Sequence, residues 1–261
     1  MNGTEDARIP TVAELTNGVL PGLLRDAEAI SHYGDSAISS GAMDRYSTLM
    51  ESAAVTGLSD TISSIVAALT QADPRTIARN PSWYDRFTGK HIEKRVRYQN
   101  ARDEVEALLV VGNTHLDRVN ETLKVLDELQ DIYRDEIARL QVFIQAGRDF
   151  LASKAGQDEQ DIDALGFDRP RERFARKLTN LATLLASNEM AAMQMKMTRA
   201  QCIDLVDRFI ETTRVLVPVW RQHTLSLITI KNIAPDDIAK ASQAHQALLS
   251  SLHTNLEGMD K

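Results

Sequence analysis

Residues 105–151 read VEALLVVGNTHLDRVNETLKVLDELQDIYRDEIARLQVFIQAGRDFL, and their apolar side chains recur in alternating steps of four and three. Eleven of the fourteen positions in the two resulting series are apolar or aromatic. A heptad pattern of this length is typical of a long helix that packs along a second helix. We therefore predict one helix over residues 92–152. The two series are Leu109, Leu116, Leu123, Gln130, Ile137, Ile144, Leu151 and Val105, Gly112, Val119, Leu126, Tyr133, Leu140, Gly147.

A second heptad run predicts another long helix over residues 171–231. Polar residues interrupt its apolar series at Asn188, Arg199 and Thr213. Such residues usually fix the register of paired helices, and a buried ligand site is the alternative explanation. Further along, the stretch VLVPVW contains Pro218, which cannot donate a backbone hydrogen bond and distorts a helix interior. We therefore expect a bend near residue 218.

The two long helices are expected to form an antiparallel hairpin, because the segment between them, SKAGQDEQDIDALGFDRP (residues 153–170), is acidic and typical of a loop. If Leu151 lies opposite Phe174, the numbers of facing residues sum to about 325. This register places Trp220 beside Val105 and Gln130 beside Met195. Whether the pair forms within one chain or between two chains stays open at this point.

The remaining sequence completes an all-α prediction. Residues 1–10 are polar and expected to be disordered, and residues 11–90 are expected to hold short helices and a connector. The third part, residues 91–261, forms the long-helix bundle, with a final helix over residues 236–257. The apolar period of LSDTISSIVAALTQADP predicts a helix that ends at Asp73-Pro74. Two prolines and a glycine then predict a connector over residues 73–90, held by the aromatic residues Trp83, Tyr84 and Phe87.

Composition excludes several classes of protein. The net charge of −7 gives no general attraction to nucleic acid. The single cysteine, Cys202, excludes an intramolecular disulfide and makes a reducing, cytoplasmic location the natural expectation. The amino-terminal residues do not resemble a signal peptide, and no apolar run is long enough to span a bilayer. We therefore expect a soluble protein, with any membrane contact limited to the inner membrane's surface.

No catalytic, phosphate-binding or metal-binding motif occurs in the sequence. The histidines lack the spacing of a zinc site and are expected to be surface or core residues. Cys202 falls on the apolar series of the second helix, so we expect a buried thiol rather than a reactive one. We predict that the protein is not an enzyme and needs no cofactor or metal.

Two basic clusters are candidate anion contacts. The first lies in GKHIEKRVRYQNAR and includes Lys90, Arg95 and Arg97. The second lies in RPRERFARK, where three arginines near a helix start would combine guanidinium groups with exposed amides: Arg169, Arg171 and Arg173. The alternative for both clusters is a structural role at helix ends. The methionine-rich segment MAAMQMKM, residues 190–197, is either core filler, which we favour, or an adaptable partner surface.

The sequence resembles the TelA-like toxic-anion (tellurite) resistance proteins. The resemblance rests on VPVWRQHTLSLI (217–228), supported by FTGKHIEKRVRYQNARDEVEALL (87–109) and LQVFIQAGRD (140–149). It covers residues 80–232, and it identifies Pro218, Trp220, Arg221 and Gln222 as the positions of the most specific motif. At 261 residues the chain would be a short member. The resemblance implies a helical bacterial protein associated with tellurite resistance, stress responses and plasmids, with no established catalytic residues.

Three functions remain in competition. The favoured one is a non-enzymatic helical scaffold that acts through protein partners, either other tellurite-resistance products or a second copy of the chain. The second is direct binding of an oxyanion at one of the arginine clusters. The third is association with an anionic membrane surface through the basic, aromatic segment between Trp83 and Arg102.

Overall fold

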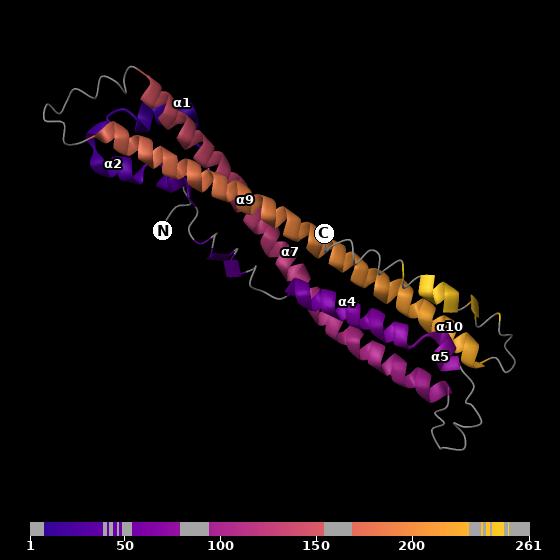
Figure 1. Ribbon diagram of the computed structural model, residues 1–261. Coiled ribbons are helices and arrows are strands. Elements are labelled where there is room, and N and C mark those ends of the chain that lie inside the picture. Colours follow the sequence, from indigo (N-terminus) through magenta and orange to yellow (C-terminus); the bar gives the residue numbers. More distant parts are fainter. Residues whose placement is uncertain are drawn as a thin grey trace. The chain divides into compact units, whose positions relative to one another are not determined.

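The computed structural model describes residues 8–38, 41, 44–45, 47–48, 54–78, 94–153, 169–229, 236, 239–240, 242–247 and 250, and no strand occurs among them (Figure 1). The all-α prediction is confirmed. The elements are α1 (Val12–Glu14), η1 (Leu15–Val19), η2 (Leu23–Arg25), α2 (Ala27–His32), η3 (Asp35–Ala37), α4 (Ala54–Gln71), α5 (Pro74–Ala78), α7 (Lys94–Ala152), α9 (Pro170–Glu211), η5 (Thr212–Leu216) and α10 (Val217–Thr229).

The two long predicted helices are present. Helix α7 matches the prediction over residues 92–152, and α9 continues through η5 into α10, which together match the prediction over residues 171–231. Most of the acidic segment 153–170, the aromatic residues Trp83, Tyr84 and Phe87, and most of the amino-terminal tail lie outside the described residues. The described residues between 236 and 250 are helical, in agreement with the predicted final helix.

The chain forms two compact units. Unit 1 comprises Met1–Glu51 with Lys124–Arg199, and unit 2 comprises Ser52–Leu123 with Ala200–Lys261. Each long helix therefore contributes one part to each unit. The segments that the sequence suggested, 11–90 and 91–261, are both divided between the units, because the short helices pack on different parts of the long ones.

The core of unit 1 forms where the amino-terminal helices pack on α7 and α9. Tyr33 is buried between Phe143 and Phe174, both in edge-to-face contact, and its hydroxyl donates to the Phe143 carbonyl oxygen at 2.8 Å. Gly147 of α7 allows α9 to come close, since a Cβ atom there would lie 2.5 Å from a methyl carbon of Leu178. The glycine in the heptad series is thus a point of close helix contact.

Polar pairs define the register of α7 and α9 in unit 1. The Asn188 side-chain amide donates to the Glu136 carboxylate at 2.9 Å, and both residues are buried. Arg199 donates to the Asp127 carboxylate at 2.6 Å. Both pairs lie within one residue of the predicted antiparallel sum, so the register is confirmed. The polar interruptions of the second helix therefore have partners within the chain.

In unit 2, α4 packs its apolar face against the long helices. The residues Leu58, Ile62, Ile65 and Leu69, which form the apolar period of this helix, are all buried. Gly112 of α7 lies in close contact with the ring of Phe209. The predicted connector needs a correction: it begins with a helix, α5, because the Asp73 carboxylate accepts from the Arg75 backbone N–H at 2.7 Å and so caps a new helix start.

The expected bend near residue 218 takes a different form. The irregular turn is η5, a π-helical segment that ends just before α10, where the Val217 N–H donates to the Thr212 carbonyl oxygen five residues earlier. A proline removes one donor and its ring crowds the carbonyl four residues back. A wider turn before Pro218 relieves this crowding while the chain stays helical.

Candidate functional site

The motif from Pro218 to Gln222 divides between the interior and the surface of unit 2. Trp220 is fully buried and Arg221 is half-buried, whereas Pro218 and Gln222 are exposed. Helix α10 produces this division because residues two apart point to different sides of a helix. The motif therefore has an inner part, which holds the unit together, and an outer part, which solvent can reach.

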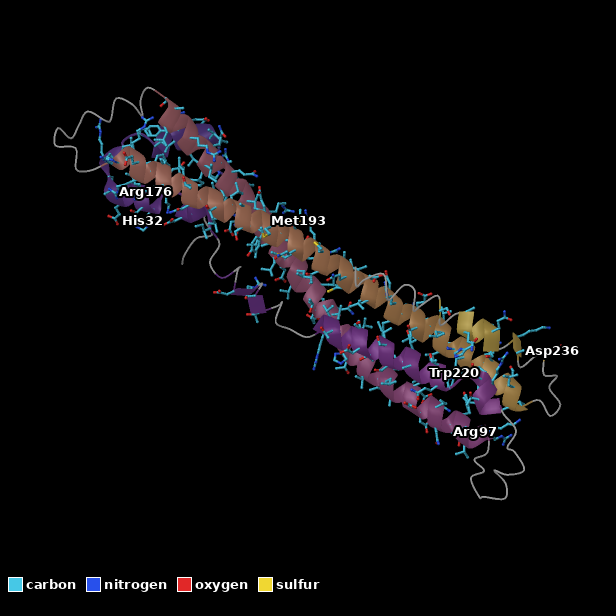
Figure 2. The ribbon with its side chains drawn as sticks, viewed as in Figure 1. His32, Arg97, Arg176, Met193, Trp220 and Asp236 are labelled. Carbon is cyan, nitrogen blue, oxygen red and sulfur yellow. The ribbon has the colours of Figure 1, made fainter. Side chains whose placement is uncertain are left out.

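Trp220 joins three elements of unit 2 (Figure 2). Its indole N–H donates to the carbonyl oxygen of Ala72, between α4 and α5, at 2.8 Å. Its ring stacks on Tyr98 of α7, with 5.7 Å between ring centroids and 26° between ring planes. The prediction that Trp220 packs beside the start of the first long helix is confirmed, although the recorded partner is Tyr98, about two turns before Val105.

Arg221 belongs to a charged cluster on the side of α7. Its guanidinium lies 3.2 Å from the Glu106 carboxylate, which also accepts from Arg102 at 2.6 Å. The hydrogen bond from Arg102 lowers the pKa of Glu106 and raises the pKa of Arg102. The side chains of Arg102, Glu106 and Arg221 are 46%, 40% and 41% exposed, so solvent screens the cluster and it contributes little to stability. The residue numbers of Arg221 and Glu106 sum to within two of the predicted value, so the pair agrees with the predicted antiparallel register in unit 2.

The end of α4 is held by the last described residues of the chain. The Asp73 carboxylate accepts from the Ser242 hydroxyl at 3.0 Å, and Arg75 donates to the Ala239 carbonyl oxygen at 3.2 Å. The buried His245 ring lies with Nε2 3.1 Å from the Leu69 carbonyl oxygen. Burial is the main cause that lowers the pKa of His245. This histidine is a core residue, which is one of the two environments expected for the histidines.

The outer part of the motif shares one face with exposed apolar side chains. Val215 and Leu225 are 44% and 40% exposed, and they flank Pro218 and Gln222 at steps of three, four and three residues. We call these four residues the α10 outer face; Val215 lies in η5, and the other three lie in α10. Single exposed apolar residues are common on protein surfaces, but here they line one side of a helix together with two motif positions.

The arginines predicted to contact anions at the start of α9 are close together but bind the protein itself. Arg171 donates to the Leu151 carbonyl oxygen of α7 at 2.6 Å, and Arg173 donates to the Ala27 carbonyl oxygen at 3.2 Å. Arg169 pairs with Glu172 at 3.2 Å. The free carbonyls at the end of a helix need donors, so Arg171 has a structural role at the end of α7, and Arg173 joins α9 to the first residue of α2. Anion binding at this cluster stays a prediction.

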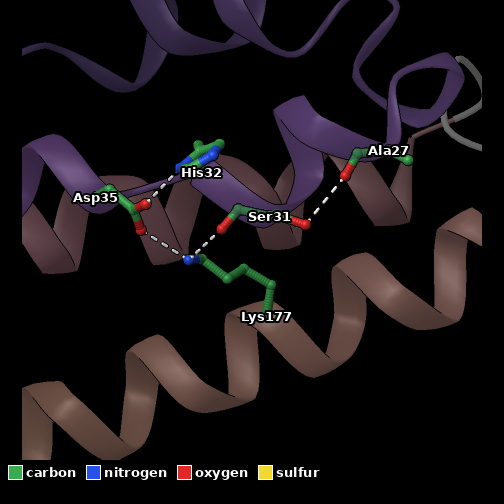
Figure 3. A network of polar contacts seen from close by, with 5 residues as sticks. All are labelled: Ala27, Ser31, His32, Asp35 and Lys177. Carbon is green, nitrogen blue, oxygen red and sulfur yellow. Dashed lines mark hydrogen bonds and ion pairs between the residues drawn. The ribbon is translucent and has the colours of Figure 1, made fainter.

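Lys177 extends this arrangement (Figure 3). Its ammonium group donates to the Ser31 carbonyl oxygen at 2.6 Å and to the Asp35 carboxylate at 2.8 Å. The hydrogen bonds from Lys177 and then His32 lower the pKa of Asp35. Lys177 therefore joins α9 to α2 and η3, and no local pattern indicates these partners, because Asp35 lies 142 residues away in the sequence.

The first basic cluster is described only in part. Arg97 donates to the Thr76 carbonyl oxygen of α5 at 2.8 Å, Arg95 is exposed, and Lys90 lies outside the described residues. Cys202 is fully buried, and burial raises the pKa of its thiol. Among the described residues, no group of three or more histidines, cysteines or acidic residues is placed to hold a metal ion.

The family model of the toxic anion resistance protein (TelA) matches residues 23–251, which include the motif at Pro218–Gln222. The chain belongs to this family. It is 48% identical over 250 residues to protein KlaA of Escherichia coli, a match that covers 96% of this chain and 97% of KlaA. No solved structure matches the chain. The resemblance that the sequence motifs suggested is therefore confirmed.

Sequence reasoning identified the motif but missed what surrounds it. Tyr98 and Ala72 contact the buried Trp220, and neither was singled out. The α10 outer face had a detectable signal, because Val215, Pro218, Gln222 and Leu225 follow a helical period. Within the described residues, no helix is both long enough and apolar enough to cross a membrane.

Proposed function

We propose that this toxic-anion resistance family member is a non-enzymatic scaffold in tellurite resistance, and that it acts in the cytoplasm by binding a protein partner. The partner contacts the α10 outer face: Val215, Pro218, Gln222 and Leu225. The observation that carries the proposal is the division of the motif. Two of its residues fix α10 to the unit, while the other two join exposed apolar side chains on one face.

The rigid attachment of α10 supports this proposal. A surface held by the buried Trp220, through its bond to Ala72 and its stacking on Tyr98, changes little when a partner binds. Preorganisation reduces the entropy that binding would otherwise cost. The outer face also mixes apolar side chains with the Gln222 amide, and apolar contact with a few polar groups is typical of protein interfaces.

Direct reduction of the anion is a weaker alternative. A thiol must ionise and be reachable to donate electrons to an oxyanion. Cys202 is buried with a raised pKa, which keeps its thiol protonated at neutral pH. Direct anion binding is also less favoured, because Arg171 and Arg173 already donate to helix carbonyls.

Photo-crosslinking in cells tests the proposed surface. A photoreactive amino acid replaces Gln222 in one variant and Val110 in a control, which is 68% exposed on α7 of the same unit. We expect a covalent adduct with a second kind of polypeptide at position 222 and none at position 110. Equal labelling at the two positions, or no adduct at position 222, would overturn the proposal.

A further inference from the structure

Helix α9 carries an exposed methionine stripe in unit 1. Met190, Met193 and Met197 are 64%, 66% and 60% exposed, and Figure 2 labels Met193 on this helix. The expectation that the methionine-rich segment fills the core holds for Met195, which is fully buried, but not for these three. Large apolar side chains exposed in a row mark an interaction surface more often than single ones do.

The exposed residues on the outer side of α9 follow the spacing of a coiled coil. Thr183 and Ala186 are also exposed, so the exposed positions run from 183 to 197 in steps of three and four. The inner series, which includes Leu181, Asn188 and Met195, is buried against α7. Helix α9 thus has two heptad faces, and the outer one suits a second helix. We call the residues Thr183, Ala186, Met190, Met193 and Met197 the methionine stripe.

Charge is arranged beside the stripe and not on it. The exposed neighbours Ser187 and Gln194 on one edge are uncharged, whereas the other edge carries Glu189 and Lys196. Both charged residues are exposed, and Glu189 accepts one long hydrogen bond, 3.4 Å, from Gln141. Glu189 and Lys196 have opposite charges and lie seven residues apart on one edge. When such a helix meets an inverted copy of itself, the two residues face each other and form pairs of opposite charge.

We propose that two copies of this chain associate through the methionine stripe, with the two α9 helices antiparallel. The two-fold axis passes between Met190 and Met193, so that Met190 of each copy faces Met193 of the other. Ala186 then faces Met197 of the second copy, which sets a small side chain against a large one. A two-fold interface uses the same patch on both chains.

The charged edge selects this alignment. In an antiparallel pair of identical helices, the same edge of each helix faces its counterpart. Glu189 of each copy therefore lies opposite Lys196 of the other copy, which makes two such pairs. A parallel pair would instead place each charge opposite the uncharged edge with Ser187 and Gln194. Complementary charges at these flanking positions set partner choice and orientation in coiled coils. Unbranched methionine side chains adapt to each other at such a contact. The proposal uses unit 1 and does not rest on the α10 outer face.

Sedimentation velocity of the purified full chain over a wide range of concentrations tests the dimer. We expect a monomer–dimer equilibrium that Met193→Lys shifts to monomer, since it places two positive charges at the axis. Val110→Lys, at an equally exposed site of unit 2, should sediment as the wild type does. A wild type that stays monomeric, or a Met193→Lys variant that dimerises normally, would overturn the proposal. Circular dichroism checks that the variants remain folded.

Charge reversal tests the antiparallel alignment. Glu189→Lys and Lys196→Glu should each weaken self-association severalfold, because each places like charges opposite one another. The double variant Glu189→Lys/Lys196→Glu restores opposite charges across the axis and should recover wild-type association. A double variant weaker than either single variant would contradict this alignment.

Discussion

The indole N–H of Trp220 donates to the carbonyl oxygen of Ala72 at 2.8 Å, and both residues are buried in unit 2. This bond joins α10 to the turn between α4 and α5, where an unpaired carbonyl would be costly. The tryptophan of the most specific sequence motif therefore has a structural role. Its exposed neighbours Pro218 and Gln222 remain available for binding.

Replacing Trp220 should mainly reduce stability. We expect Trp220→Ala to lower the free energy of unfolding by about 3–5 kcal/mol, since it leaves a large cavity. Trp220→Phe keeps much of the apolar contact but leaves the Ala72 carbonyl unpaired, at a cost of about 1–3 kcal/mol. Urea unfolding monitored by circular dichroism measures both. A Trp220→Ala variant as stable as the wild type would show that the indole is not needed for the fold.

A double-mutant cycle should measure the interaction free energy between the buried residues Asn188 and Glu136. Asn188→Leu removes the donor at 2.9 Å and leaves the buried carboxylate with one bond fewer, so we expect a loss of about 1.5–3 kcal/mol. Adding Glu136→Leu removes the buried charge and should recover most of this loss. Urea unfolding of the two single variants and the double variant supplies the test. Additive losses in the double variant would argue against a coupled pair.

Glycines of α7 should resist replacement despite their low helix propensity. A Cβ atom at Gly147 would lie 2.5 Å from Leu178, and one at Gly112 would meet the Phe209 ring. We expect Gly147→Ala and Gly112→Ala each to cost about 1–3 kcal/mol through overpacking. Gly18 has no atom within 4 Å of such a Cβ and is the matched control. Thermal melts should show lower midpoints for the first two variants and no loss for Gly18→Ala.

His245 should make unit 2 sensitive to mild acid. Burial holds the pKa of His245 below its ordinary 6.5, so above that pH the ring is neutral in folded and unfolded chains. As the pH falls below about 6.5, the unfolded chain binds the proton more tightly than the folded chain does. The free energy of unfolding therefore decreases as the pH approaches the pKa of His245 in the folded chain. Asp73 opposes this shift and His223 adds to it.

The variant His245→Gln isolates this effect. Its amide can still donate to the Leu69 carbonyl oxygen but cannot ionise. We expect the free energy of unfolding to decrease as the pH falls below about 6.5 in the wild type and to vary less in the variant. Identical pH profiles for the two proteins would show that His245 does not titrate on unfolding in this range.

The apolar pattern predicted the fold because heptad spacing constrains both helices at once. Matching the end of one series to the start of the other gave a register that the pairs Glu136–Asn188 and Asp127–Arg199 confirm. Burial of Cys202 followed from the same series, and the register placed Trp220 near the start of α7. In each case a local repeat contained the information that the structure uses.

Other features depend on contacts between distant residues, and the sequence did not predict them. The bonds from Arg171 to Leu151 and from Arg173 to Ala27 exist only after helix ends meet. The π-helical turn at Thr212–Leu216 was expected only as a bend near Pro218, because the local pattern does not specify the hydrogen bond from the Val217 N–H to the Thr212 carbonyl oxygen. The methionine-rich segment contains positions on both faces of α9, so its composition alone could not separate Met195 from Met193.

Survival of tellurite-treated cells tests the central claim most directly. Cells express the wild type, Leu225→Lys on the α10 outer face, or Val110→Lys elsewhere on unit 2, with soluble protein level and melting temperature matched. The account predicts that Leu225→Lys loses protection while its stability is unchanged, and that Val110→Lys protects as the wild type does. Full protection by Leu225→Lys, or no protection by the wild type, would contradict it.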